Sequence, residues 1–122
     1  MIPFATETVT LLKRVETQID RRTHVSYERR LLTGCSWRRT SSWTQMDTEM
    51  RRTETVTCRI PPGQARPEPG DYLFLGDVPT DGDPAELLTV HRATGAFRIG
   101  SVGDHTLPGT PIPHYAARSD AM

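Results

Sequence analysis

The sequence predicts a small all-β protein, an antiparallel β-barrel or sandwich with long loops and at most a short helical turn. Runs of alternating apolar and polar residues recur along the chain, Pro and Gly separate them, and no window shows a capped amphipathic helix. With 122 residues, 35% of them hydrophobic, the chain has the size of one domain with a modest core. We therefore expect a single β-barrel-like domain over residues 1–122, with extended loops near 41–52 and 76–86 and a flexible C-terminal end.

Two strands are expected in the first third of the chain. Residues 7–15 are rich in β-branched side chains and place Val9 and Leu11 on one face. Residues 23–32 continue the alternation, and their apolar face is expected to consist of Val25, Tyr27 and Leu31.

The next strands flank a variable middle segment. Gly34 interrupts the pattern, after which Cys35 and Trp37 face the same way. Residues 53–60 show the cleanest alternation in the chain, and a half-buried antiparallel strand is expected there with Val56, Cys58 and Ile60 facing inward.

Proline and glycine at 61–63 must end that strand, because proline cannot donate to a ladder. Residues 71–76 then form a short apolar run, which is typical of a strand buried on both faces.

The last third is expected to be a hairpin and a closing strand. Residues 87–92 are predicted as a strand that turns at Thr94-Gly95 into 96–99, with a single helical turn near 84–87. Gly100 is the expected site of a bulge, and 114–118 is a last short strand.

Charge is balanced overall but unequal along the chain. Residues 1–60 carry 11 basic and 7 acidic side chains, whereas residues 61–122 carry 4 and 8. A neutral chain is not a generic nucleic-acid binder of the strongly basic kind. The bipolar pattern suits heterologous contacts that close a ring, and it equally suits a monomer with two differently charged faces.

No segment has the apolar length of a spanning helix, and the N-terminus lacks a signal-peptide pattern, so a soluble protein made in the cytoplasm is expected. In that reducing compartment Cys35 and Cys58 are expected as two buried thiols rather than a disulfide.

The sequence offers no signature of catalysis or metal binding. The four histidines lie far apart, and the acidic run at 77–83 has Leu88 where a calcium loop would need its glutamate. Nucleophile and phosphate-loop motifs are absent as well. We therefore expect a protein that is not an enzyme and that uses no cofactor or metal.

Four arginine doublets mark the first half, at 21–22, 29–30, 38–39 and 51–52. Arginine suits interfaces because its planar fork pairs with carboxylates and phosphates and is weakly hydrated. A coding bias towards arginine explains the doublets as well, since the chain has one lysine.

Residues 41–52 combine aromatic, methionine and arginine side chains between two strands, a composition typical of protein interfaces. Either these side chains cap the core, or a protruding hairpin or loop carries them to a partner. The candidate residues for a subunit interface or a DNA channel are Arg38, Arg39, Trp43, Met46, Met50, Arg51 and Arg52.

Several distributed motifs resemble a family of small minor structural proteins encoded in the head-tail modules of siphophages and prophages. The motifs are Gly34-Cys35-Ser36-Trp37, the strand Glu54–Pro61, Gly70-Asp71, the run Ile99–His105, Gly109-Thr110 and His114-Tyr115. His105 and Tyr115 depart from the residues usual in that family. The resemblance covers most of the chain, and its motifs are structural.

The resemblance implies a small β-barrel in the neck of a tailed-phage virion, made in the host cytoplasm. Its partners would be copies of itself in a ring, the portal or adaptor, and tail-terminator or tail proteins, with possible non-specific DNA contact and no membrane. A head-closure (stopper) or connector subunit is the leading expectation. A tail terminator or tail-completion subunit, a host β-barrel binding module and a small hydrolase with a convergent site are the alternatives.

Overall fold

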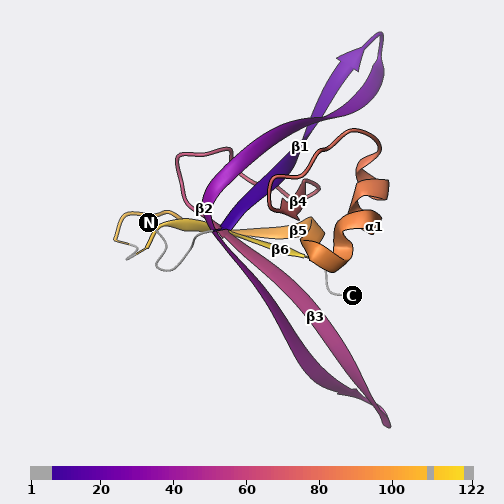
Figure 1. The fold of residues 1–122 in the computed structure, drawn as a ribbon, viewed down its shortest axis with the longest axis vertical. Helices are drawn as coiled ribbons and strands as arrows, with labels where there is room; N and C mark the ends of the chain where they lie inside the picture. The colour runs from indigo at the N-terminus through magenta and orange to yellow at the C-terminus, as the bar shows by residue number, and fades with distance from the viewer. Residues whose placement is uncertain (1–6, 110–111, 120–122) are drawn as a thin grey trace.

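The computed structural model describes residues 7–109 and 112–119, without the side chains of Ser42, Thr44, Met46, Arg51 and Thr53. Within this part the strands form a closed antiparallel barrel in the order β1-β2-β3-β6-β5-β4 (Figure 1). The predicted all-β fold is confirmed. The elements are β1 (Glu7–Ile19), β2 (Arg22–Met46), β3 (Glu49–Ile60), β4 (Tyr72–Leu75), α1 (Pro84–Gly95), β5 (Ala96–His105) and β6 (His114–Ser119).

Alternate residues of every strand fill the barrel interior, because successive side chains of a strand point to opposite faces. The expected inward positions of β1 and β3 are confirmed, and Trp37 packs on this core with its ring centroid 5.1 Å from that of Phe97. The buried interior consists of Val9, Leu11, Leu32, Cys35, Val56, Cys58, Ile60, Leu73, Phe97, Ile99 and Ala117.

Helix α1 corrects the expectation of a strand at 87–92, a tight turn at Thr94-Gly95 and only one helical turn. Asp83 caps the helix, since its carboxylate accepts a hydrogen bond from the backbone N–H of Ala85 at 3.3 Å, and Pro84 follows in the first turn. These start signals outweigh the weak helix propensity of the Val and Thr residues that suggested a strand.

A second apolar cluster lies between α1 and the outside of the barrel. Leu12, Phe74, Val78 and Ala96 are buried there, with Leu87 and Leu88 of the helix partly buried against them. This explains why β4 is buried on both faces, as expected: Leu73 points into the barrel and Phe74 points towards the helix. The ring centroids of Phe74 and His91 are 5.9 Å apart.

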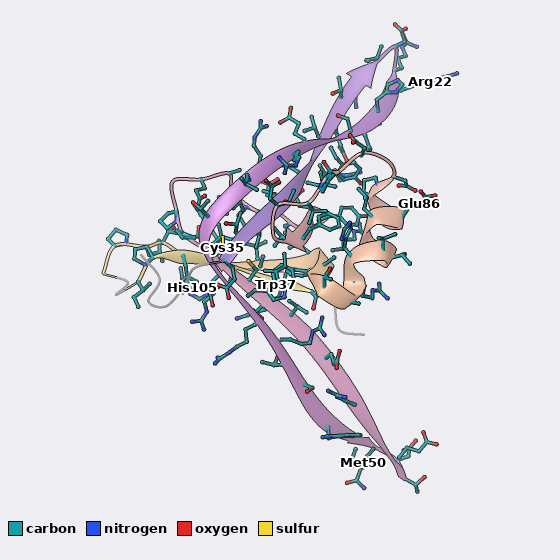
Figure 2. The ribbon with its side chains drawn as sticks, viewed as in Figure 1. Arg22, Cys35, Trp37, Met50, Glu86 and His105 are labelled. Carbon is teal, nitrogen blue, oxygen red and sulfur yellow. The ribbon has the colours of Figure 1, made fainter. Side chains whose placement is uncertain are left out.

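Two hairpins extend beyond the barrel, and β2 contributes a strand to both (Figure 1). We call residues 14–27 the first arm and residues 38–55 the second arm. The first arm turns through Asp20 and Arg21 at φ of 50° and 64°, and the second turns at Asp47 with φ of 54°. The arms diverge from the barrel, one towards the top and the other towards the bottom of the view, and the second arm includes the expected interface segment 41–52 (Figure 2).

Two bulges set which residues face inward. Val9 pairs with Leu32 whereas Glu7 pairs with Cys35, so β2 carries an extra residue near Gly34, whose φ is 68°. The expected bulge at Gly100 is confirmed by the register shift between Ile99 and Ser101.

The shared face expected for Val25, Tyr27 and Leu31 in 23–32 is confirmed, but it does not supply the core. The three side chains lie on the outer face of β2, and Leu32 is the residue in the core. The bulge near Gly34 determines which residues of β2 face inward. Towards its tip the first arm lies beyond the barrel, so no core covers its apolar residues.

The carboxylate of Asp71 fastens the loop after β3 to β1. It is buried, and it accepts hydrogen bonds from the backbone N–H groups of Arg14 at 2.9 Å and Glu68 at 3.0 Å. The Nζ of Lys13 lies 3.8 Å from it.

Residues 76–83, expected as part of an extended loop near 76–86, are tied to the barrel, and residues 84–86 belong to α1. The buried hydroxyl of Thr10 donates to the carbonyl of Gly76 at 2.7 Å and accepts from the N–H of Val78 at 3.0 Å. Residues 120–122, the end of the expected flexible C-terminus, lie outside the described residues.

Candidate interaction surfaces

The second arm has two faces of different chemistry. In the ladder Arg39 pairs with Val56, Trp43 pairs with Arg52 and Gln45 pairs with Met50, so these residues share the face that continues the barrel interior. We call this face the arm face. The opposite face has Arg38 opposite Thr57 and Thr40 opposite Thr55.

The arm face exposes its large apolar side chains. Trp43 is 65% exposed and Met50 is 58% exposed. The core-capping alternative is therefore wrong for these two residues, and the protruding hairpin is the element that carries them. The side chains of Met46 and Arg51, two further candidate residues, lie outside the described part of the structure.

The arginines of the second arm differ in their partners. Arg52 forms an ion pair with Glu54 at 3.1 Å and donates to the hydroxyl of Ser41 at 3.4 Å, so it lies flat along the arm face. Within residues 7–109 and 112–119, the side chains of Arg38 and Arg39 make no hydrogen bond or ion pair. These two charges are available to a partner.

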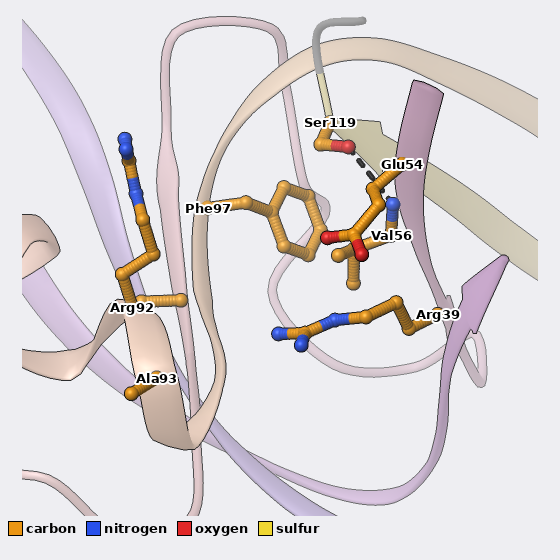
Figure 3. A pocket seen from close by; sticks show the side chains of 8 residues that line it. Arg39, Glu54, Val56, Arg92, Ala93, Phe97 and Ser119 are labelled. Atoms are coloured by element: carbon orange, nitrogen blue, oxygen red, sulfur yellow. Dashed lines mark hydrogen bonds between the residues drawn. The ribbon is translucent and has the colours of Figure 1, made fainter. Parts of the chain in front are cut away.

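A pocket of about 240 Å³ lies at the base of the second arm, between the arm and the end of α1 (Figure 3). Phe97 and Val56 provide its apolar wall, and Arg39, Glu54 and Arg92 surround it. The Ser119 hydroxyl accepts a hydrogen bond from the N–H of Val56 at 2.9 Å and is thereby engaged in holding β6 to β3. The pocket suits an apolar side chain flanked by a charge.

A second, open pocket of about 380 Å³ lies on the outside of the barrel, where Arg14 and Arg98 stand beside Gly70 and Gly100. Arg14 already pairs with Glu16, while Arg98 has no ion pair among the described residues. Its chemistry is that of a shallow anion-binding surface.

The arginine doublets of the first half do not gather into one patch. Arg29 pairs with Asp77 and donates to the carbonyl of Val78 at 3.3 Å, so it fixes the segment that precedes α1. Arg30 pairs with Glu28 at 2.8 Å. Arg21 and Arg22 lie at the tip of the first arm (Figure 2).

The two cysteines are free and buried in the barrel, as expected. A hydrogen bond between the thiols lowers the pKa of Cys35, whereas the same bond together with burial raises the pKa of Cys58 well above its usual value. Cys35 also lies 3.7 Å from the carbonyl of Thr33. Because both sulfurs are buried, neither thiol can act as a nucleophile on a molecule in solution.

Two histidines that are distant in sequence meet at the pairing of β5 with β6. The rings of His105 and His114 stack at 4.8 Å, and Nδ1 of His114 lies 2.8 Å from the carbonyl of Ile112. No group of three potential metal ligands occurs among residues 7–109 and 112–119. Next to the pair, hydrogen bonds from Thr106 lower the pKa of Asp104.

Sequence reasoning missed the acidic, helical surface next to the barrel. Asp83 and Glu86 belong to α1 or its cap and are exposed, and Val90 on the same helix is 72% exposed. The Asp-Pro pair at 83–84 with an acidic residue in the first turn is the start signal that identifies this helix.

No helix in the described part is both long and apolar enough to cross a membrane.

Comparison with known proteins places the chain in a family. A family described as "Family of unknown function (DUF6751)" matches residues 4–118. No curated protein and no solved structure matches the chain. Since the match spans nearly the whole sequence, the chain belongs to the DUF6751 family.

Proposed function

We propose that this protein is a structural subunit of a tailed-bacteriophage virion, a head-closure (stopper) or connector subunit in a ring that joins the portal or adaptor to the tail. It acts by assembly rather than by catalysis. Its partners are copies of itself and the neighbouring neck proteins, and it works in the virion after synthesis in the host cytoplasm.

The observation that carries the proposal is the pair of arms on one closed barrel. A closed barrel offers no free sheet edge for pairing with a partner strand, so the arms that project beyond it are the elements best placed for contacts. The second arm projects Trp43 and Met50, which are exposed, and it carries Arg38 and Arg39, whose side chains make no ion pair or hydrogen bond within residues 7–109 and 112–119. Exposed aromatic, methionine and arginine side chains together are typical of contact surfaces.

The resemblance in sequence to small head-tail proteins supports the same reading, because its motifs map to structural positions. Glu54–Pro61 covers most of β3, Gly70-Asp71 is the fastening of the loop to β1, and Ile99–His105 is the bulged part of β5. These residues build the barrel. In a ring, arginines that face the lumen would contact DNA through its phosphates, without sequence preference.

A tail terminator or tail-completion subunit would use the same barrel and arms at a neighbouring position in the particle. A host β-barrel binding module would present the arm face to a host protein instead. The two classes differ in partner, so the assembly state with phage proteins separates them.

The test is assembly with a tailed-phage portal protein. Native mass spectrometry and negative-stain electron microscopy of the mixture should show a complex that contains several copies of the chain in a closed ring. The double variant Arg51→Glu/Arg52→Glu should reduce ring formation and virion yield while the circular dichroism spectrum stays unchanged.

Arg21→Glu/Arg22→Glu is the matched control for the charge change on the other arm, and its comparison shows which arm carries the contact. A chain that stays monomeric with portal, adaptor and tail proteins, and whose deletion leaves intact particles, would contradict the proposed function.

A further inference from the structure

The second arm and the exposed side of α1 are complementary surfaces at different places on the same molecule. The arm face presents Arg39, Trp43 and Met50, and the helix presents Asp83, Glu86 and Val90, which we call the helix strip. Residues 76–86 contain four carboxylates and no basic residue. One surface is therefore basic and apolar, and the other is acidic and apolar.

The residues of the helix strip lie on one face of α1, because they are three and four positions apart, the spacing at which helical side chains share a face. Leu87 and Leu88 turn towards the barrel and are partly buried, which directs Glu86 and Val90 away from it. Asp77 is already paired with Arg29, whereas no ion pair involves Glu86 among the described residues.

The two surfaces also match in length. Four residues of strand separate Arg39 from Trp43, which is about 13 Å at the rise of a β-strand. Seven residues of helix separate Asp83 from Val90, which is about 10 Å at the rise of an α-helix. An arginine side chain is long enough to cover the difference, so Trp43 can pack on Val90 while Arg39 reaches the carboxylates at the start of the helix.

The tip of the second arm does not reach the start of α1 in the same molecule. Figure 2 shows Met50 at the tip of that arm and Glu86 on the helix, well separated from each other. Only the base of the arm, at Arg39, lies near α1, at the end of the helix, so a second copy is needed to bring the whole arm face onto the helix strip. Two different patches that complement each other on separate copies make a heterologous contact, and such contacts close into rings or continue as filaments.

We infer that the second arm of one copy lies across helix α1 of the next copy, with Trp43 and Met50 on Val90 and the arm arginines on Asp83 and Glu86. This contact would join neighbouring subunits of the proposed ring. It rests on the proposed function in one respect, that the partner is a second copy of the chain. Apolar side chains at the centre hold the contact, and the charges set its direction.

The first experiment traps the contact between two singly substituted chains of different tag size. Gln45→Cys lies on the arm face and Thr89→Cys is exposed on α1 next to Val90, so mixing them under mild oxidation should give the mixed disulfide dimer. Thr40→Cys, on the opposite face of the same strand, is the matched control. Its mixed disulfide dimer with Thr89→Cys should form at least about tenfold more slowly, because residue 40 lies outside the contact. Equal rates for the two mixtures would overturn the inference.

The second experiment reverses the charges. Arg39→Glu and Glu86→Arg should each weaken self-association, measured by sedimentation, by about tenfold or more, and the chain carrying both should recover most of that loss. Arg38→Glu on the opposite face is the control and should change it less than about threefold. No loss with the single variants, or no recovery with the double variant, would overturn the arm-to-helix contact.

These outcomes are distinguishable from failure of the proposed function. Rings that form with the portal although both tests fail would leave the neck function standing and remove this contact. Trapping and charge recovery without any portal or tail complex would support self-association and contradict the neck function.

Discussion

Removing the carboxylate of Asp71 should destabilise the barrel strongly, because this buried group holds two segments together. It accepts two hydrogen bonds from backbone N–H groups, those of Arg14 on β1 and Glu68 in the loop after β3. Hydrogen bonds to a charged group are worth about 1.5–3 kcal/mol each. Asp71→Ala should therefore lower the free energy of unfolding by about 3 kcal/mol or more, since both bonds to the buried carboxylate are lost.

The assay is equilibrium urea unfolding followed by tryptophan fluorescence and circular dichroism. For a slope of about 1.5 kcal/mol per molar urea, the midpoint should fall by about 2 M. Asp71→Asn keeps one acceptor oxygen but turns an amide N–H₂ towards a donor, so its loss should be intermediate.

Glu68→Ala is the control from the same loop. Glu68 is exposed and its carboxylate lies 3.7 Å from Lys13, so the loss should stay within about 1 kcal/mol, as for other surface ion pairs. An Asp71→Ala variant as stable as Glu68→Ala would refute the reasoning.

Three further results are expected. Gly95→Ala should destabilise the protein by about 1–3 kcal/mol in thermal unfolding, because φ is 136° there and an added Cβ would lie 2.9 Å from that of Leu75; an unchanged melting temperature would count against it. The carboxyl of Asp104 should titrate by NMR below the usual aspartate range, and its pKa should rise in Thr106→Val. Because the folded-state pKa is lowered, the contribution of this carboxyl to stability is present above its unfolded-state pKa. That contribution is lost as the pH falls through the folded-state pKa. Trp43→Ala should change the free energy of unfolding by no more than about 0.5 kcal/mol, since the side chain is exposed, so a large loss would show that it supports the fold.

The barrel could be predicted from sequence because its strands alternate in the simplest way. The pattern of Val56, Cys58 and Ile60 predicted β3 and its buried face, and Gly100 predicted the bulge in β5. Alternation shows only which residues share a face, not which face points inward. For 23–32 the inward face is determined by a bulge near Gly34 that the pattern does not reveal.

Helix α1 was missed for a different reason. It buries only a narrow side, with Leu87 and Leu88 partly covered, so its apolar periodicity is weak, and the cap at Asp83 is the stronger signal. The candidate segment 41–52 was identified by composition, but its direction relative to the barrel depends on the long pairing of β2 with β3, which is a tertiary property.

Both arms share the single strand β2, whose 25 residues span roughly 80 Å when extended. A load applied at the tip of one arm therefore runs along a continuous backbone through the barrel to the tip of the other. Because ladder hydrogen bonds lie perpendicular to the strands, a pull along β2 shears many bonds at once and does not unzip them singly. A pull between the two arm tips is thus carried by the backbone of β2 and by ladder bonds loaded in shear, and it does not open the ladder from one end.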